Sequence, residues 1–296
     1  MGTFRIHEPL ESTAGDCVKE SLNSMSQPLN LTIITPSFNQ GLYIEQTISS
    51  VLRQDYLHVE HIVIDGGSTD STVDVLKRYP HLRWVSEKDR GQADALNKGL
   101  AIATGDIIGW INSDDYYDAN IFESVVRCFQ DPDVMWVVGN LTYRFEDSNE
   151  TIPGRSPVVT FDRLLNSPDI VRQQPTFFRK TFIERAGGWN PECFMVMDFE
   201  LWVRLAKISP PIMVDKNWAY FRLHPLQKTS YANTLRQARE LVAILKHEQV
   251  HWTTIANLWL RKWWASMKGC LKVFLLNAGI INPRYRSRPI RITREK

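Results

Sequence analysis

The sequence predicts an α/β fold in which a mostly parallel sheet carries helices on both faces and is followed by a C-terminal helical extension. Over the first half of the chain, short apolar runs rich in β-branched residues alternate with segments of helical periodicity. This alternation implies right-handed crossovers between parallel strands. The 296 residues are 43% hydrophobic and 23% charged. Such a composition is typical of globular proteins and excludes a disordered or fibrous chain.

The first elements follow a polar stretch, residues 1–28, that we expect to form a loose leader. Apolar, β-branched runs predict strands at residues 31–35, 61–65, 82–86, 106–111 and 134–138. The segments between them predict helices at residues 41–54, from 68 onward, at 91–103 and at 122–129. The first of these shows the pattern clearly, because Ile44, Ile48 and Val51 recur at helical spacing.

The alternation stops near residue 140, and a segment of mixed pattern follows. A helix is then expected at residues 197–207, where Leu201, Trp202 and Leu205 form an apolar face. Beyond residue 231 the pattern is helical again and rich in tryptophan.

Cysteine usage and hydropathy indicate a soluble protein of a reducing compartment, which we expect to be the cytoplasm. The four cysteines are far apart and form no CxxC pair, which argues against a zinc site or a disulfide scaffold. No secretory signal is visible. The apolar runs at residues 249–260 and 273–283 are shorter than the ~20 residues of a membrane-spanning helix.

Three polar clusters follow predicted strands, at Ser37-Phe-Asn, at Asp65-Gly-Gly-Ser and at Ser113-Asp-Asp. Parallel sheets bind ligands beyond the carboxyl ends of their strands, so we expect one shared site. Adjacent carboxylates such as Asp114 and Asp115 point in opposite directions on extended chain. One can reach a ribose while the other binds Mg²⁺ or Mn²⁺ beneath a diphosphate. Each cluster alone is equally compatible with a turn and a helix cap.

A second constellation lies further along the chain. Asp198 starts a predicted helix, where it is either a cap favoured by the helix dipole or a general base at a cleft wall. Glu200 is the next candidate for such a base. His224 stands in Arg-Leu-His-Pro, and a lone histidine is more often a structural residue than a metal ligand.

Taken together, residues 31–225 resemble the inverting family 2 glycosyltransferases, whose catalytic domain has the Rossmann-like, nucleotide-sugar-binding GT-A fold. The order and spacing of the motifs carry the resemblance, and each motif singly is weak. They are ThrProSerPheAsn (35–39), AspGlyGlySerThrAsp (65–70), the run 89–99, AlaThrGlyAsp (103–106), AsnSerAspAsp (112–115), GlnProThrPhePheArg (174–179), GlyGlyTrp (187–189), MetAspPheGluLeuTrp (197–202) and ArgLeuHisPro (222–225).

The resemblance implies roles for individual positions. The donor would be a nucleotide diphosphate sugar, the cofactor a divalent cation (Mg²⁺ or Mn²⁺), and the acceptor a glycan, polysaccharide or lipid-linked sugar. Asp198 would be the base, Asp115 the metal ligand, and His224 would close the metal or diphosphate site. The donor would contact Pro36, Ser37, Phe38, Asp65, Asp94 and Asp114, with the first three flanking the nucleobase. The GT-A-like domain would span residues 29–230 and the basic, Trp-rich extension residues 231–296.

Two departures from the family pattern concern the donor. Many members have Asp where this chain has Asn112, and many have a second Asp, which commonly reads uracil, where this chain has Gly66. The identity of the nucleotide is therefore open. Asp94, on the neighbouring helix, is our candidate for the missing carboxylate and for nucleobase selection, with a plain helix position as the alternative.

Other functions are weighed against this one. A sugar-nucleotide pyrophosphorylase would favour a Gly-rich basic loop after the first strand, where this chain has Pro36-Ser-Phe-Asn39. A non-catalytic sugar-nucleotide-binding protein is compatible with Asn112. Residues 261–296 carry ten Lys/Arg and one acid, which leaves the rest of the chain at −7. With Trp252, Trp259, Trp263 and Trp264, this basic tail indicates peripheral contact with an anionic membrane or, as an alternative, ordinary packing; no nucleic-acid partner is expected.

Overall fold

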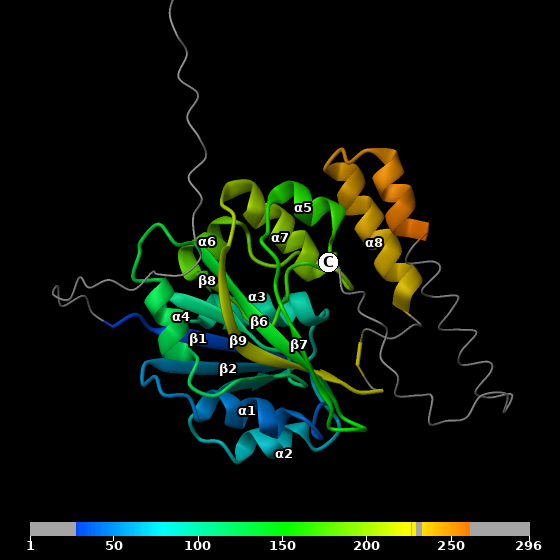
Figure 1. Ribbon diagram of the computed structural model, residues 1–296. Helices are drawn as coiled ribbons and strands as arrows, with labels where there is room; N and C mark the ends of the chain where they lie inside the picture. The colour runs from blue at the N-terminus through cyan, green and yellow to red at the C-terminus, as the bar shows by residue number, and fades with distance from the viewer. Residues whose placement is uncertain (1–27, 226, 229–232, 261–296) are drawn as a thin grey trace, which may run out of the picture.

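The computed structural model describes residues 28–225, 227–228 and 233–260. Its strands form a nine-stranded mixed sheet in the order β3-β2-β1-β4-β8-β6-β9-β5, with β7 paired to β6 (Figure 1). The strands are β1 (Leu31–Ser37), β2 (Val59–Asp65), β3 (Arg83–Ser86), β4 (Ile107–Trp110), β5 (Tyr116–Tyr117), β6 (Trp136–Phe145), β7 (Thr151–Gly154), β8 (Thr176–Arg179) and β9 (Ile212–Leu223). The first four strands in the chain are parallel, and β8 runs antiparallel to both of its neighbours.

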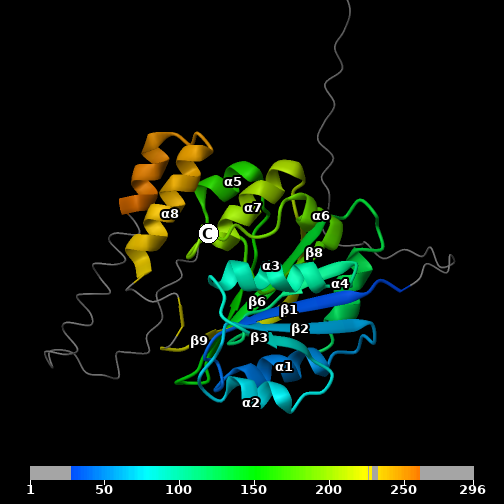
Figure 2. The same ribbon diagram turned by 180° about the vertical axis from the view of Figure 1, so that it is seen from behind.

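Helices cover both faces of this sheet (Figures 1 and 2). They are α1 (Ile44–Leu52), α2 (Thr72–Lys77), α3 (Gln92–Ile102), α4 (Phe122–Cys128), α5 (Phe161–Asn166), α6 (Lys180–Arg185), α7 (Met197–Ile208) and α8 (Thr234–His247). Alternate residues of β1 point to opposite faces: Ile34 packs with the buried residues of α3 and α7, and Ile33 with those of α4. Each face therefore has its own hydrophobic core.

The elements expected up to residue 138 are present, with ends displaced by a few residues. The strand expected at 134–138 is the beginning of the longer β6, and the helix expected at 197–207 is α7. The mixed pattern after residue 140 corresponds to β7, α5, β8, α6 and β9, which were not predicted individually. The leader expected at 1–28 lies outside the described residues apart from its last position.

The helical pattern beyond residue 231 corresponds to α8 and to a further helical stretch at residues 252–260. Leu241 and Leu245 of α8 belong to the same buried cluster as the core face of α7. The Glu240 carboxylate accepts the backbone N–H of Met195 at 2.7 Å, so α8 also holds the loop that leads into α7. In the described ranges, no helix is long and apolar enough to cross a membrane.

Candidate functional site

The carboxyl ends of the parallel strands meet at one edge of the sheet. Ser37, the last residue of β1, is in register with Asp65, the last of β2, and Asp65 is in register with Ser86, the last of β3. The neighbouring β4 ends at Trp110. The polar clusters that follow these strands are therefore brought to a common edge.

The loop after β1 presents one aromatic ring to solvent. The Phe38 side chain is 59% exposed, whereas Pro36 and Ser37 are buried within the strand. The Asn39 N–H donates to Ser68 Oγ at 2.7 Å, which ties this loop to the turn after β2. Of the three residues expected to flank a nucleobase, Phe38 is the one that offers a large accessible surface.

Asp65 shapes the turn after β2. Its buried carboxylate accepts hydrogen bonds from the Ser68 N–H at 2.9 Å and from the hydroxyls of Ser68 and Ser86 at 2.5 and 2.6 Å. These contacts occupy both carboxylate oxygens with protein groups. The geometry therefore favours a structural role for Asp65 at this edge over the direct donor contact expected for it.

Asp114 and Asp115 point in opposite directions, as expected for adjacent carboxylates. The structure encloses Asp115, which was expected to bind the metal, and leaves Asp114 accessible. Asp115 is fully buried, and its oxygens accept the Gln174 side-chain amide at 2.8 Å and the Arg222 N–H at 2.9 Å. Burial, with the Asp114 carboxylate beside it, raises the pKa of Asp115 well above its ordinary value. Because Asp115 is enclosed by protein, the geometry argues against it as the metal ligand and leaves Asp114 as the accessible carboxylate.

Asp114 faces His224. Its Oδ2 lies 3.1 Å from His224 Nε2, and the imidazole packs against the Tyr43 ring with centroids 4.3 Å apart. The buried His224 Nδ1 has no hydrogen-bond partner among the described residues. A carboxylate oxygen and an imidazole nitrogen fit a divalent cation that takes its other ligands from phosphate and water. In the described ranges no group of three or more His, Cys, Asp or Glu is arranged to hold a metal.

Arg222 holds the turn that carries these carboxylates, although no role was predicted for it. Its guanidinium lies between the rings of Tyr43 and Tyr116, 5.0 and 5.4 Å from their centroids. Its Nε donates to the Asp114 carbonyl at 2.8 Å, while its backbone N–H binds Asp115. The available signal was the Arg-Leu-His-Pro motif, in which Arg222 stands two residues before His224.

An amide network explains why Asn112 is compatible with this site. Its Oδ1 accepts hydrogen bonds from Gln92 at 2.6 Å and from the Trp110 indole at 2.9 Å, and its Nδ2 donates to Gln173 Oε1 at 3.1 Å. A carboxylate at this position could not donate to Gln173. Gln92 and Gln173 are site-building residues that sequence reasoning missed, because glutamine has no distinctive pattern by itself.

Asp198 lies in the first turn of α7. Its Oδ1 accepts the Phe199 N–H at 2.8 Å, and no hydrogen bond from the described residues reaches its Oδ2. Burial raises the pKa of Asp198, while the positive charge of Lys228 opposes that rise. A carboxylate is suited to accept a proton when its pKa is raised and one of its oxygens accepts no hydrogen bond from the described residues. Glu200 is unsuited, because it forms an ion pair with Arg204 at 2.6 Å.

Lys228 connects the region of Asp198 to the loop after β4. Its Nζ donates to the Phe194 carbonyl at 2.5 Å and to Gln92 Oε1 at 3.2 Å, and Gln92 in turn binds Asn112. Burial lowers the pKa of Lys228. The chain Lys228–Gln92–Asn112 therefore joins the region of Asp198 to the loop after β4.

The GlyGlyTrp motif positions the approach to α7. Asn97 of α3 clamps Trp189 by accepting its N–H at 2.9 Å and donating to its carbonyl at 2.7 Å. Gly188 has a φ of +69°, and a Cβ there would lie 2.5 Å from Asn97 Oδ1. Glycine is required because both the backbone conformation and the close approach exclude a side chain.

Asp94 is already engaged on its own helix. Its carboxylate pairs with Arg90 at 2.8 Å and lies 3.8 Å from Lys98 Nζ. These contacts are typical of a charged residue in the first turns of a helix. They do not support the donor contact or the nucleobase selection expected for Asp94.

Comparisons with known proteins agree with this architecture. The model of the family "Glycosyl transferase family 2" matches residues 32–199. The glycosyltransferase Rv1514c of Mycobacterium tuberculosis is 28% identical over 215 residues, which cover 64% of this chain and 74% of the relative. The putative teichuronic acid biosynthesis glycosyltransferase TuaG of Bacillus subtilis is 38% identical over 99 residues, 31% of this chain and 39% of TuaG.

Two solved structures share the fold at low sequence identity. The S. aureus TarS fragment 1–349 in complex with UDP superposes with a TM-score of 0.57 and 17% identity, covering 73% of this chain and 65% of that one. The mannosyltransferase PcManGT of Pyrobaculum calidifontis, in complex with GDP-Man and Mn²⁺, gives a TM-score of 0.57 and 21% identity, covering 85% and 79%. Both indicate a GT-A-type α/β fold.

Proposed function

The chain belongs to glycosyl transferase family 2, and we propose that it transfers a sugar from a nucleotide diphosphate sugar to an acceptor hydroxyl with inversion at the anomeric carbon. The observation that carries this proposal is the pair of carboxylates in different environments. Asp114 is accessible and faces His224, whereas Asp198 has a raised pKa and an open oxygen. These different environments suit Asp114 to a role at the leaving diphosphate and Asp198 to proton removal.

Each side chain then has a defined task. Phe38 stacks on the nucleobase, and Asp114 with His224 would hold Mg²⁺ or Mn²⁺. The cation, when bound, neutralises the negative charge that develops on the leaving diphosphate. Asp198 accepts the proton of the acceptor hydroxyl as that oxygen attacks from the side opposite the diphosphate. Attack from the opposite side in one step inverts the anomeric carbon and needs no covalent intermediate.

We propose that residues 29–230 form the GT-A-like domain and residues 231–296 its extension. The contacts of α8 support a close dependence of one on the other. Leu241 and Leu245 enter the core shared with α7, and Glu240 binds the loop that precedes Asp198. The extension therefore contributes to the position of the base.

A donor screen tests the proposed function. The full chain with Mn²⁺ should be stabilised by the correct UDP-, GDP- or dTDP-sugar, by about 2.7 kcal/mol at a donor concentration of 100 Kd. Release of the nucleoside diphosphate on incubation with acceptors or water then distinguishes an enzyme from a non-catalytic binding protein, which would show stabilisation alone. Absence of stabilisation by every donor would contradict the proposal.

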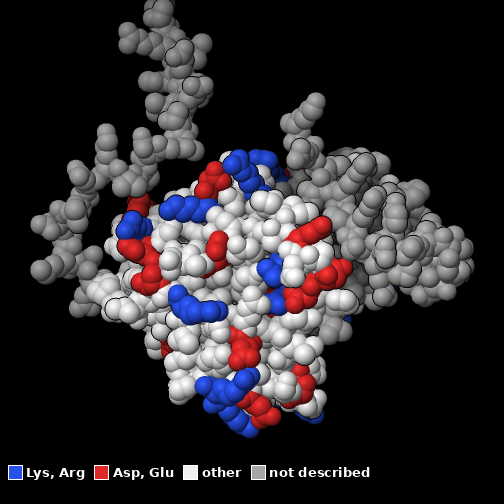
Figure 3. Space-filling view, turned by 60° about the horizontal axis from the view of Figure 1, so that its bottom comes forward, with Lys and Arg blue, Asp and Glu red and all other residues white. Residues whose placement is uncertain are grey.

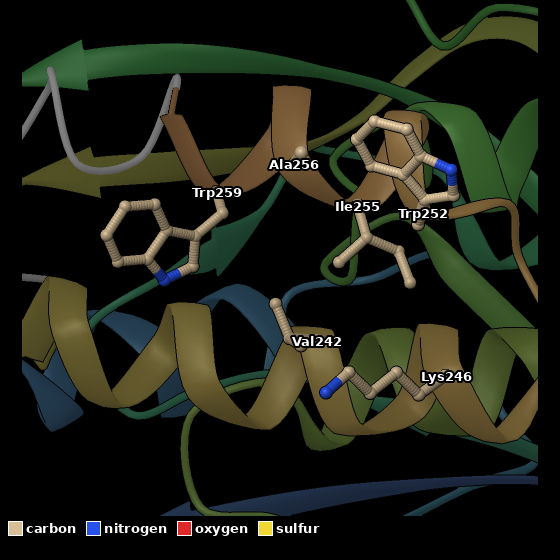
Figure 4. Close-up of a pocket in the computed structure, with 6 residues that line it drawn as sticks. All are labelled: Val242, Lys246, Trp252, Ile255, Ala256 and Trp259. Atoms are coloured by element: carbon tan, nitrogen blue, oxygen red, sulfur yellow. The ribbon is translucent and has the colours of Figure 1, made fainter.

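We also propose a peripheral contact with the cytoplasmic face of an anionic membrane. Trp252 and Trp259 are 70% and 42% exposed and border an apolar groove of about 290 Å³ between α8 and the helical stretch 252–260 (Figure 4). Lys246 lies at the same groove. Indole rings beside a lysine suit the headgroup region of a bilayer. Trp263, Trp264 and the basic residues of 261–296 lie outside the described residues.

Replacing both Trp252 and Trp259 by alanine should reduce co-sedimentation with vesicles that contain anionic lipid. Wild-type binding should weaken as salt is raised, because each basic residue near the surface contributes about 1 kcal/mol through a screened interaction. Leu57→Ala is the matched control, since Leu57 is 94% exposed but lies between α1 and β2. Equal binding of the wild type, the double variant and Leu57→Ala would show that these tryptophans are ordinary surface residues.

One face of the molecule bears on the expectation that nucleic acid is not a partner. On the face shown in Figure 3, acidic and basic side chains are interspersed rather than gathered by sign. A nucleic-acid-binding face usually has a basic stripe or patch.

A further inference from the structure

Position 66 lacks a side chain at the place where the donor's nucleobase is proposed to lie. Gly66 follows β2 directly, and its N–H donates to the Ser37 carbonyl at 2.8 Å, so it lies beside the end of β1. The exposed Phe38 ring belongs to the residue that follows Ser37, the last residue of β1. A flat base held at this edge would meet an aromatic ring and backbone, with no side chain at residue 66 to contact its edge.

The carboxylate of Asp89, which follows β3, fills the space beside Gly66. A Cβ atom added to Gly66 would lie 2.8 Å from Asp89 Oδ2 and 3.2 Å from Asp89 Cγ, closer than real Cβ contacts. Asp89 follows β3, so its side chain reaches across the strand ends to the place that a residue 66 side chain would occupy. The absence of a side chain at Gly66 and the position of Asp89 are two parts of one arrangement.

The two oxygens of Asp89 differ in their contacts. Oδ1 accepts the Gly91 N–H at 2.8 Å, and no hydrogen bond from the described residues reaches Oδ2. Burial raises the pKa of Asp89; the Gly91 N–H and the charge of Lys98 oppose the rise, and the Asp94 and Asp65 carboxylates add to it. An N–H donor from a ligand would stabilise the ionised carboxylate. Asp94, by contrast, already has Arg90 as its partner.

We propose that Asp89 Oδ2 accepts the ring N–H of the donor's nucleobase and that this base is uracil or thymine; the inference rests on the proposed function. Uracil and thymine present a single ring N–H between two carbonyls. Guanine presents two adjacent donors, which match the two oxygens of one carboxylate; here Oδ1 already accepts the Gly91 N–H, so guanine would have to share that oxygen, whereas uracil and thymine need only Oδ2. Cytosine and adenine can donate only through an exocyclic amino group, and the lone pair of the unprotonated ring nitrogen beside it repels a carboxylate.

Competition binding of nucleoside diphosphates to the full chain tests this assignment. The wild type with Mn²⁺ should bind UDP or dTDP more tightly than GDP, CDP or ADP. Asp89→Asn should weaken the binding of UDP by roughly 10–100-fold, the range for loss of a charged hydrogen bond. The same variant should bind CDP better relative to UDP, because an amide can donate a hydrogen bond to cytosine. The double variant Gly66→Asp/Asp89→Gly, which moves the carboxylate to residue 66, should recover most of the UDP affinity.

Asp94→Asn is the matched control and should leave base selectivity unchanged. Unfolding temperatures without nucleotide show whether each variant is folded. An unchanged UDP-to-CDP ratio in Asp89→Asn, or a wild-type preference for GDP, would overturn the assignment of Asp89 while leaving the glycosyltransferase proposal intact. Failure of the wild type to bind any nucleoside diphosphate would instead contradict the proposed function itself.

Discussion

Replacing Asp198 by asparagine should lower the rate of sugar transfer by about 10²–10⁴-fold, the usual contribution of a general base, while donor affinity stays near that of the wild type. Asparagine keeps the shape of the side chain and its contact with the Phe199 N–H, so the start of α7 should be preserved. Single-turnover transfer and donor binding, measured on the same preparation, separate the two effects. Glu200→Gln is the control, because Glu200 pairs with Arg204.

The pH profile gives an independent test of Asp198. The base must be ionised to accept a proton, so transfer should decline as the pH falls through its pKa. Because burial raises the pKa of Asp198, this decline should begin at a higher pH than an exposed aspartate would give. Lys228→Met removes the positive charge that lowers the pKa of Asp198, so the decline should move to a still higher pH. A transfer rate unaffected by Asp198→Asn would place the base elsewhere.

Replacing Asp114 by alanine should lower turnover by about 10²-fold or more, comparable to removing one group that stabilises developing negative charge. The Mn²⁺ concentration needed for half-maximal activity should rise, because one of the two proposed protein ligands is lost. The unfolding temperature should fall less than in Asp115→Ala, since the Asp114 side chain is partly exposed and the described side-chain partner that it leaves is His224 alone. Mn²⁺ titration of activity and a thermal melt measure both.

Asp115→Ala serves as the comparison, because we expect it to lower the stability of the protein rather than its response to Mn²⁺. It leaves the Gln174 amide and the Arg222 N–H buried without an acceptor, at a cost of about 1–3 kcal/mol for each group. The unfolding temperature should therefore fall by several degrees, whether or not Mn²⁺ is present. An unchanged unfolding temperature together with lost Mn²⁺ dependence would restore Asp115 as the metal ligand.

Local patterns in the sequence predicted the parallel half of the fold well. The β-branched runs of β1, β2 and β3 and the helical spacing of α1 and α3 are short-range features, and they agree with the tertiary packing. The region after residue 140 was harder to predict because β8 and β9 join the sheet far from their neighbours in sequence.

The family, the α/β class and the three polar clusters at one edge could be predicted from the sequence, because the order and spacing of motifs are properties of the chain. Which carboxylate is accessible was decided only by the tertiary structure. Asp114 and Asp115 are adjacent and chemically equal, and contacts with Gln174 and Arg222, 59 and 107 residues away, enclose one of them. Likewise, Asp89 lies beside Gly66 only because β3 is placed next to β2, since burial and long-range contacts are fixed by the fold and not by neighbours in sequence.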